Sequence, residues 1–342
     1  MDLSELLGFA VKNGASDIHV ATGLPPLIRV DGEMRRMEVE SLSDDVVLDM
    51  ISGIMSDSNR KEFEERWECD FAFEIPNVAR FRVNAFTQAR GPAAAFRVVP
   101  TEVLSLDQIN APPVFAELAK RPKGLVLVTG PTGSGKSTTL AAMIDYVNEH
   151  KQDHILTLED PIEFVHPSKS CLVNQREVGR HTKSFAAALK SALREDPDAI
   201  LVGEMRDMET ISLALTAAET GHLVFGTLHT SSAAKTIDRI IDVFPSDQQG
   251  MVRAMLSESV EGIVAQRLLK KIGGGRCAAY EILLGTHAIR NLIREAKVPQ
   301  IYGMMEVGQK FGMITMEKSL QQLVAQQMIA PEAAQAFSDV AG

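Results

Sequence analysis

Residues 130–137 read Gly-Pro-Thr-Gly-Ser-Gly-Lys-Ser, the G-x-x-x-x-G-K-S spacing of a P-loop. An apolar run at 125–129 precedes this segment and a helical pattern at 138–148 follows it. In such a loop the glycines let backbone N–H groups turn inward around phosphate oxygens, the lysine lies against the β and γ phosphates, and the serine hydroxyl holds Mg²⁺. We therefore predict that ATP or GTP binds here with Mg²⁺, through Gly130, Pro131, Thr132, Gly133, Ser134, Gly135, Lys136, Ser137 and Thr138.

Acidic side chains follow the next predicted strand, residues 154–159. Glu159 ends the strand, and Asp160 and Glu163 lie in the turn after it. Ligands of open α/β sheets collect at the carboxyl ends of strands, so these carboxylates are placed to reach Mg²⁺ or its waters. A solvated turn between strand and loop explains the same acids equally well, and the sequence alone does not choose between the two interpretations.

Glu204 stands at the tip of a second buried strand, predicted over residues 199–203. An apolar strand followed by an acid is the Walker B arrangement. A general base must lie within hydrogen-bond reach of the proton that it takes, and this position allows Glu204 to polarise the attacking water. We also predict that Glu204 joins Ser137 and Glu163 around Mg²⁺. The alternative is an exposed acid at the end of a strand.

Two histidines flank a fourth strand, predicted over residues 223–227. His229 lies past the end of this strand, on the side of Glu204 and the P-loop, and is placed to sense the γ-phosphate. His222 lies at the opposite end of the strand. A lone histidine is more often a structural residue. At the position of His229 sensing and a structural role are about equally well supported, whereas at His222 sensing is less well supported.

Arginines alternate with apolar residues on a predicted hairpin that turns at residues 88–91. If the hairpin is symmetric, Arg82 pairs with Arg97, on the face that does not carry Phe81 and Val83. Like charges directly opposed across strands are destabilising. An anion between the two guanidinium groups would remove that penalty, and arginine forks match phosphate oxygens. A basic, solvated strand face is the alternative.

The bulk properties restrict the class of protein. A chain of 342 residues predicts two domains. The net charge of −10 argues against a duplex nucleic-acid partner, which needs a basic face. The three cysteines lie far apart and indicate neither a zinc ribbon nor a disulfide framework. We find no signal peptide and no apolar run of the ~18 residues that a membrane span needs. We therefore expect a cytosolic protein that is not inserted in the membrane and contacts it through a partner.

The pattern along the chain predicts an α/β fold in two domains. Residues 1–100 form an α+β domain with a hairpin that turns at Asp31-Gly32, and residues 101–122 form a linker. From residue 123 to 285, strands and helices alternate in the way typical of a parallel sheet flanked by helices. Beyond Ser231 the pattern is mostly helical, and residues 286–342 form a helical C-terminal region.

Four blocks occur in a fixed order: the P-loop, Leu-Glu-Asp-Pro-Ile-Glu-Phe-Val-His at 158–166, Gly-Glu-Met-Arg-Asp at 203–207 and Thr-Gly-His-Leu-Val-Phe-Gly-Thr-Leu-His at 220–229. They resemble the Walker A, Asp, Walker B and His boxes of the type II/type IV secretion ATPase superfamily. Within that superfamily the chain is similar to the pilus retraction ATPases, which also carry Ala-Ile-Arg-Asn-Leu-Ile-Arg-Glu, here at 288–295. The resemblance covers essentially the whole chain.

The resemblance implies a PAS-like N-terminal domain and a RecA-like P-loop ATPase domain with a helical C-terminal region, assembled as a homohexameric ring. It implies Glu204 as the catalytic glutamate, Arg82 and Arg97 as arginine fingers, and His222 and His229 as His-box residues at the nucleotide. It further implies work at the cytoplasmic face of the inner membrane, on a pilus platform protein and beside an accessory retraction ATPase paralogue.

Other functions remain open. An assembly or secretion ATPase usually carries a long extra N-terminal region and a four-cysteine insertion, and both are missing from this sequence. An accessory retraction paralogue is disfavoured by the 288–295 block. A RecA-like nucleic-acid translocase is disfavoured by the acidic composition, and a scaffold that binds ATP without turnover is disfavoured by Glu204.

Overall fold

The computed structural model describes residues 2–30, 32–76, 78–99 and 102–335. The chain divides into two compact units, residues 1–102 and 103–342. Asp31 of the predicted Asp-Gly turn, residues 100 and 101 at the start of the predicted linker, and the last residues of the predicted helical region lie outside the described residues. The boundaries that we expect at 100, 122 and 285 stay predictions.

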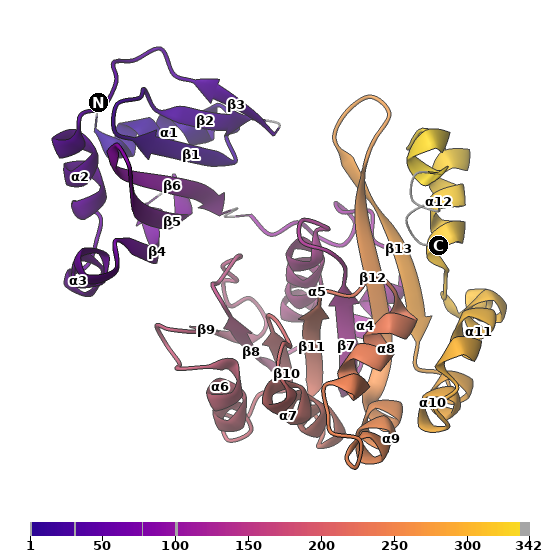
Figure 1. The fold of residues 1–342 in the computed structure, drawn as a ribbon. Coiled ribbons are helices and arrows are strands. Elements are labelled where there is room, and N and C mark those ends of the chain that lie inside the picture. Colours follow the sequence, from indigo (N-terminus) through magenta and orange to yellow (C-terminus); the bar gives the residue numbers. More distant parts are fainter. Residues whose placement is uncertain (1, 31, 77, 100–101, 336–342) are drawn as a thin grey trace. The chain divides into compact units, whose positions relative to one another are not determined.

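The N-terminal unit is an antiparallel sheet with helices on one face (Figure 1). Its sheet order is β3-β2-β1-β6-β5-β4. Phe81 and Val83 are buried with residues of the first two helices, whereas Arg82, between them in sequence, is exposed. The elements are α1 (Leu3–Lys12), β1 (Asp17–Ala21), β2 (Leu27–Val30), β3 (Glu33–Arg36), α2 (Asp44–Ser52), α3 (Asp57–Arg66), β4 (Glu68–Ile75), β5 (Ala79–Gln88) and β6 (Gly91–Val99).

The second unit begins with α4 (Val114–Ala119) and contains a mostly parallel sheet in the order β13-β12-β7-β11-β10-β8-β9. Neighbouring strands are parallel except for β12 and β13, which are antiparallel. Its other elements are β7 (Gly124–Thr129), α5 (Lys136–His150), β8 (His154–Glu159), β9 (Leu172–Glu177), α6 (Phe185–Ala192), β10 (Ala199–Val202), α7 (Met208–Glu219), β11 (Leu223–Leu228), α8 (Ala233–Asp242), α9 (Gln249–Ser259), β12 (Val260–Lys270), β13 (Arg276–Leu284), α10 (His287–Arg294), η1 (Val298–Gln300), α11 (Ile301–Val307), η2 (Gly308–Phe311) and α12 (Met316–Ala325).

Helices cover both faces of this sheet because its central strands are apolar on both sides. Leu125 and Leu127 of β7 belong to the core beneath α6 to α11, whereas Val126 and Val128 belong to the core beneath α4 and α5. Successive strand residues point to opposite faces, so a strand between two helical layers is apolar without interruption. The α/β fold class and the four central strands predicted from the sequence are confirmed.

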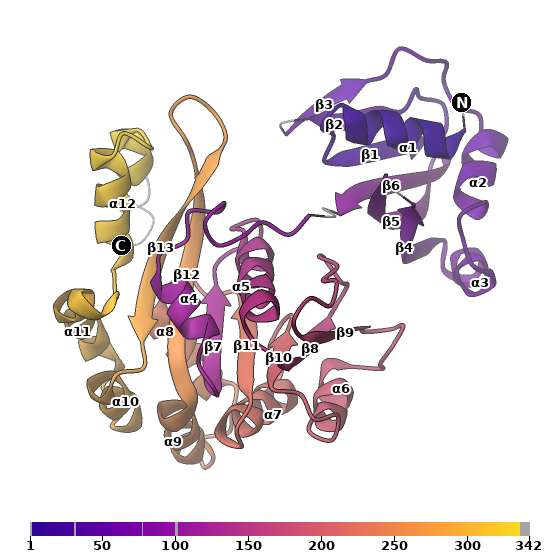
Figure 2. The ribbon, with the colours of Figure 1, turned by 180° about the vertical axis from the view of Figure 1, so that it is seen from behind.

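The described residues beyond Ser231 are mostly helical, as expected, but the expectation missed a long hairpin that β12 and β13 form there. Both views show this hairpin extending past the rest of the sheet, with α12 beside it (Figures 1 and 2). In β12 the residues from Gly262 to Gln266 are all buried, so the strand shows no alternation of apolar and polar residues. A short run buried on both faces does not distinguish strand from helix by periodicity.

The helix of the 288–295 block, α10, is amphipathic as predicted. Ile289 and Ile293 are fully buried in the sheet core, and Leu292 packs against it. Arg290 of the same helix forms an ion pair with Glu261 at 2.6 Å. The helix is therefore a packed part of the unit. In the described residues no helix has the length and apolarity that a bilayer crossing requires.

Candidate functional site

The P-loop joins β7 to α5 at the carboxyl end of the sheet. Gly130, Gly133 and Gly135 have φ values of 144°, 78° and 86°, which favour glycine. Lys136 is the first residue of α5, and its side chain is buried. Its ammonium group donates to the carbonyl oxygens of Gly130 at 2.9 Å and Pro131 at 3.1 Å. The loop therefore curls around the lysine, as a phosphate cradle at a helix N-terminus requires.

Glu204 and His229 meet beside this loop. Because β7, β11 and β10 are parallel neighbours, their carboxyl ends lie side by side at the same end of the sheet. Glu204 follows β10, His229 follows β11, and the imidazole Nε2 lies 3.2 Å from the Glu204 Oε1. The predicted proximity of these two residues is confirmed.

Arg206 is a residue of this cluster to which the sequence analysis gave no role. Its Nε lies 2.6 Å from the Glu204 Oε1. Burial pushes the pKa of the Glu204 carboxyl up, but hydrogen bonds and charges from Arg206 and His229 outweigh burial and hold the pKa below its usual value. Glu204 is therefore held as an ionised carboxylate, the form that accepts a proton from water. Arg206 belongs to the block at 203–207, but no local pattern in that block indicates that it pairs with Glu204.

Glu163 and Glu204 both act electrostatically on the P-loop lysine. Burial lowers the pKa of Lys136, and the negative charges of Glu204 and Glu163 act in the opposite direction without overcoming it. Both carboxylates therefore lie within electrostatic reach of the P-loop lysine, and their common role in one site stays a prediction. Mg²⁺ prefers oxygen ligands and usually retains waters and phosphate oxygens. The Ser137 hydroxyl and the carboxylates of Glu163 and Glu204 can supply oxygen ligands of that kind.

Glu159 is buried, and its carboxylate holds the loop that carries Glu163. It accepts hydrogen bonds from the Thr157 hydroxyl at 2.6 Å, the Gln175 amide at 3.1 Å and the backbone N–H of Glu163 at 3.3 Å. Burial raises its pKa above the usual value despite these bonds. The structure thus gives Glu159 a role in positioning the loop, and its predicted place beside Mg²⁺ or its waters at the nucleotide site stays a prediction.

Gln175 of β9 is a second residue that sequence reasoning missed. Its amide donates to the carbonyl of Phe164 at 2.8 Å, and its oxygen accepts from the N–H of His166 at 2.8 Å. Together with its bond to Glu159, this fixes both ends of the loop segment from 163 to 166. The strand around Gln175 is polar and was not recognised as a strand.

His222 does not lie with the P-loop of its own chain. Leu223 of β11 pairs with Gly124, at the start of β7, so His222 stands at the amino end of the strands. Its ring Nδ1 lies 3.0 Å from the carbonyl oxygen of Ala217, at the end of α7. Within one chain, His222 therefore caps the carboxyl end of α7. Its predicted binding of nucleotide stays a prediction.

Arg82 and Arg97 are paired across β5 and β6 in the predicted register. Arg97 also pairs in register with Asp17 of β1, and its Nε lies 2.9 Å from the Asp17 Oδ1. Burial works to raise the pKa of Asp17, but Arg97 and Ser16 hold it below its usual value. Asp17 thus compensates part of the repulsion between the arginines, so the need for an external anion is weaker than the sequence suggested.

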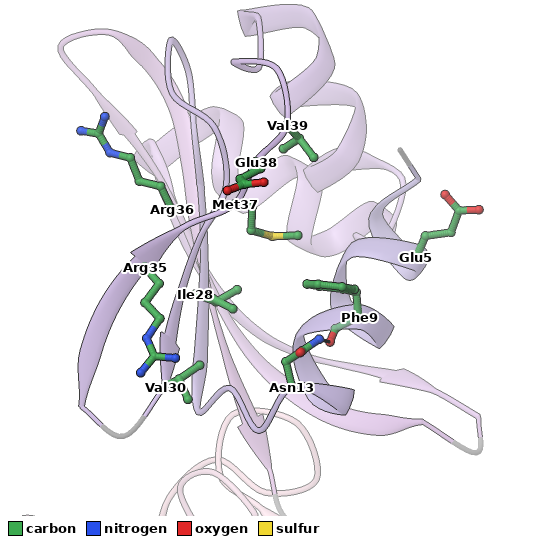
Figure 3. Close-up of a pocket in the computed structure, with 10 residues that line it drawn as sticks. All are labelled: Glu5, Phe9, Asn13, Ile28, Val30, Arg35, Arg36, Met37, Glu38 and Val39. Carbon is green, nitrogen blue, oxygen red and sulfur yellow. Dashed lines mark hydrogen bonds between the residues drawn. The ribbon is translucent and has the colours of Figure 1, made fainter.

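A pocket of the N-terminal unit lies between α1 and the edge formed by β2 and β3 (Figure 3). Phe9, Ile28 and Met37 supply apolar surface, and charges of both signs, such as Glu5 and Arg35, lie at its margin. None of its lining residues belongs to the four blocks. Its chemistry is not that of a phosphate site.

The family model described as "Type II/IV secretion system protein" matches residues 2–327. The chain is 62% identical over 332 residues to the "Type IV pilus retractation ATPase PilT" of Pseudomonas aeruginosa, covering 97% of this chain and 96% of the relative. It is 40% identical over 342 residues to the "Type IV pilus ATPase PilU" of the same organism, covering 100% and 90%.

Among solved structures, the crystal structure of the pilus retraction motor PilT with bound ADP superimposes with a TM-score of 0.93. The two chains are 50% identical, and the match covers 98% of this chain and 96% of the other. The ordered blocks, the fold and both comparisons agree, and the chain belongs to the type II/IV secretion system protein family.

Proposed function

We propose that this chain is an ATP-hydrolysing motor that powers the retraction of type IV pili, and with it twitching motility. The observation that carries the proposal is the likeness to a pilus retraction ATPase over nearly the full length of both chains. The P-loop, Glu204 and His229 at one edge of the sheet supply the chemistry that such a motor needs.

In the proposed reaction, the P-loop N–H groups and Lys136 hold the phosphates of ATP. Ser137 and Glu163 would hold Mg²⁺, which would supply positive charge to neutralise the phosphates. Glu204 accepts a proton from the attacking water, and His229, in contact with Glu204, reports whether the γ-phosphate is present. Bound ATP shifts the two units towards the arrangement for which it has the higher affinity. Hydrolysis removes the γ-phosphate and with it that difference in affinity, so the units can return to the other arrangement.

We further propose that the motor is a homohexameric ring at the cytoplasmic face of the inner membrane. It acts on a platform protein of the pilus machine, so that pilin subunits are withdrawn from the fibre. An accessory ATPase related to PilU is a candidate partner, because a pilus ATPase of that name is 40% identical to this chain over 342 residues. Neither nucleic-acid binding nor insertion in the membrane is part of this function.

Arg82 and Arg97 are proposed as arginine fingers. Arg82→Ala and Arg97→Ala are each expected to lower steady-state turnover about 10³-fold, because fingers of this kind contribute that much or more to phosphoryl transfer. Phosphate release by purified protein measures the effect. Arg35→Ala, an exposed arginine on β3 of the same unit, is the matched control.

If the arginines complete a neighbour's site, mixing either variant with wild-type subunits should depress turnover by more than the fraction of variant added. Activity that falls only in proportion to that fraction would contradict a shared catalytic assembly. Full activity of each purified variant on its own would mean that these arginines do not take part in catalysis.

Deletion of the gene tests the cellular role. Cells that lack this chain should carry abundant surface pili, counted by electron microscopy, and should fail to twitch, because assembly continues without retraction. Restoring the gene should restore twitching. Cells without pili would instead identify an extension motor and would overturn the proposed direction of work.

A further inference from the structure

Gln266 lies directly behind the P-loop. It follows Ala265, the last residue of β12 that pairs with β7, where its partner is Thr129. The side chain is only 2% exposed. Its amide Nε2 donates to the Ser134 carbonyl oxygen at 2.8 Å, and its Oε1 accepts from the Thr139 hydroxyl at 2.7 Å. One buried carboxamide therefore connects β12 both to the loop and to the first turn of α5.

The loop approaches this strand too closely for side chains at two of its glycines. A Cβ atom on Gly130 would lie 2.4 Å from the Gln266 carbonyl oxygen, and one on Gly135 would lie 2.9 Å from the Gln266 Nε2. Glycine is therefore needed at these two positions for close packing against β12 as well as for the positive φ angle. The two surfaces are in direct contact, so a displacement of Gln266 would be transmitted to the loop.

The contact is part of a larger buried network. Gln266 pairs in register with Tyr280 of β13. Burial raises the pKa of Tyr280 to about 12, and an interaction with the Thr139 side chain acts in the opposite direction. The Tyr280 ring packs edge-on against Phe115 with a centroid distance of 5.0 Å. A polar network whose members are bonded in this way is rigid and has one preferred geometry.

The bond to Ser134 has a consequence for phosphate binding. A peptide group is planar and trans, so its C=O and N–H point in opposite directions. The Ser134 carbonyl belongs to the same peptide as the Gly135 N–H. Because Gln266 holds that carbonyl behind the loop, the Gly135 N–H is directed away from β12. This is the direction that an N–H group needs if it is to bind phosphate in the concave side of the loop.

We propose that Gln266 is a positioning residue for nucleotide, which fixes the Ser134–Gly135 peptide and thereby directs the Gly135 N–H at phosphate. This role rests on the proposed function, because it concerns the same nucleotide site. Thr139 has a different part: its hydroxyl donates to Gln266 and so joins β12 to α5, whereas the Ser134 carbonyl accepts from Gln266.

Gln266→Glu and Thr139→Val separate positioning from simple stability. Glutamate at 266 still accepts from Thr139 but has no N–H for Ser134, whereas valine at 139 leaves the bond to Ser134 intact. We expect Gln266→Glu to raise the Kd for ADP about tenfold, since a single hydrogen bond is worth up to that factor. Thr139→Val should lower the melting temperature and change the Kd by less than about twofold. If Gln266→Glu does not fold, Gln266→Met, of similar length and uncharged, replaces it.

Titration with a fluorescent ADP gives the Kd, a thermal melt gives stability, and hydrogen exchange of residues 131–137 reports the order of the loop. Faster exchange and weaker binding in the Gln266 variant alone support the role. Wild-type affinity in that variant, or affinity losses in both variants that follow their losses of stability, overturn it. A wild-type protein that binds no nucleotide would overturn the proposed function as well.

Discussion

Replacing Lys136 with alanine is expected to abolish measurable ATP hydrolysis and to weaken nucleotide binding at least about tenfold. The Lys136 ammonium is buried in the P-loop, donates to two of its carbonyl groups and lies within electrostatic reach of Glu163 and Glu204. Charge-assisted hydrogen bonds to phosphate contribute about 1.5–3 kcal/mol, and the substitution removes those that Lys136 makes. The remaining loop would face the phosphates with backbone N–H and hydroxyl groups but without the positive charge of the lysine.

Phosphate release at saturating ATP and titration with a fluorescent nucleotide measure the two effects. Lys190→Ala, an exposed lysine on α6 of the same unit, is the control and should behave as the wild type. Near-normal turnover by Lys136→Ala would mean that the P-loop motif does not mark the catalytic site.

Glu204→Gln is expected to retain nucleotide binding and to lose turnover by about 10³-fold, within the range that a general base contributes. The substitution keeps the shape of the side chain, and its amide oxygen can still accept from Arg206 and His229, which now contact the carboxylate. It removes the negative charge that takes a proton from water. The loss should therefore appear in kcat and not in the affinity for ATP.

Single-turnover hydrolysis with prebound ATP separates the two quantities, and Glu219→Gln, at the exposed end of α7, is the matched control. If Glu204→Gln loses binding together with turnover, Glu204 holds the metal or the fold and another group is the base. If it retains turnover, the assignment of Glu204 as the base is wrong.

The sequence predicted the central strands and the residues of the carboxyl edge well, because these depend on local patterns. The P-loop, Glu204 and His229 each follow a short apolar strand, and parallel strands bring their carboxyl ends together whatever lies between them. The register of Arg82 with Arg97 was also predictable, since a short hairpin loop fixes it.

The residues that hold these groups in place were not predictable in the same way. Gln266 contacts Thr139 and Ser134 across sequence separations of 127 and 132 residues. Gln175 lies on a polar strand at the sheet edge, and Asp17 reaches Arg97 from 80 residues away. The local spacing of apolar and polar residues does not reveal contacts between residues so far apart in the sequence. They follow only from the order of the strands in each sheet.

The strand order also determines when during synthesis the nucleotide site forms. The P-loop strand β7 lies between β11 and β12, both of which follow it in the chain by a long interval. A nascent chain that ends before Leu223 contains the complete P-loop motif but neither of the strands that flank β7. Chains emerge from the ribosome with their N-terminal parts first. The P-loop therefore lacks the strands that support it until β12 has been made, so we expect nucleotide to stabilise this unit only late in its synthesis.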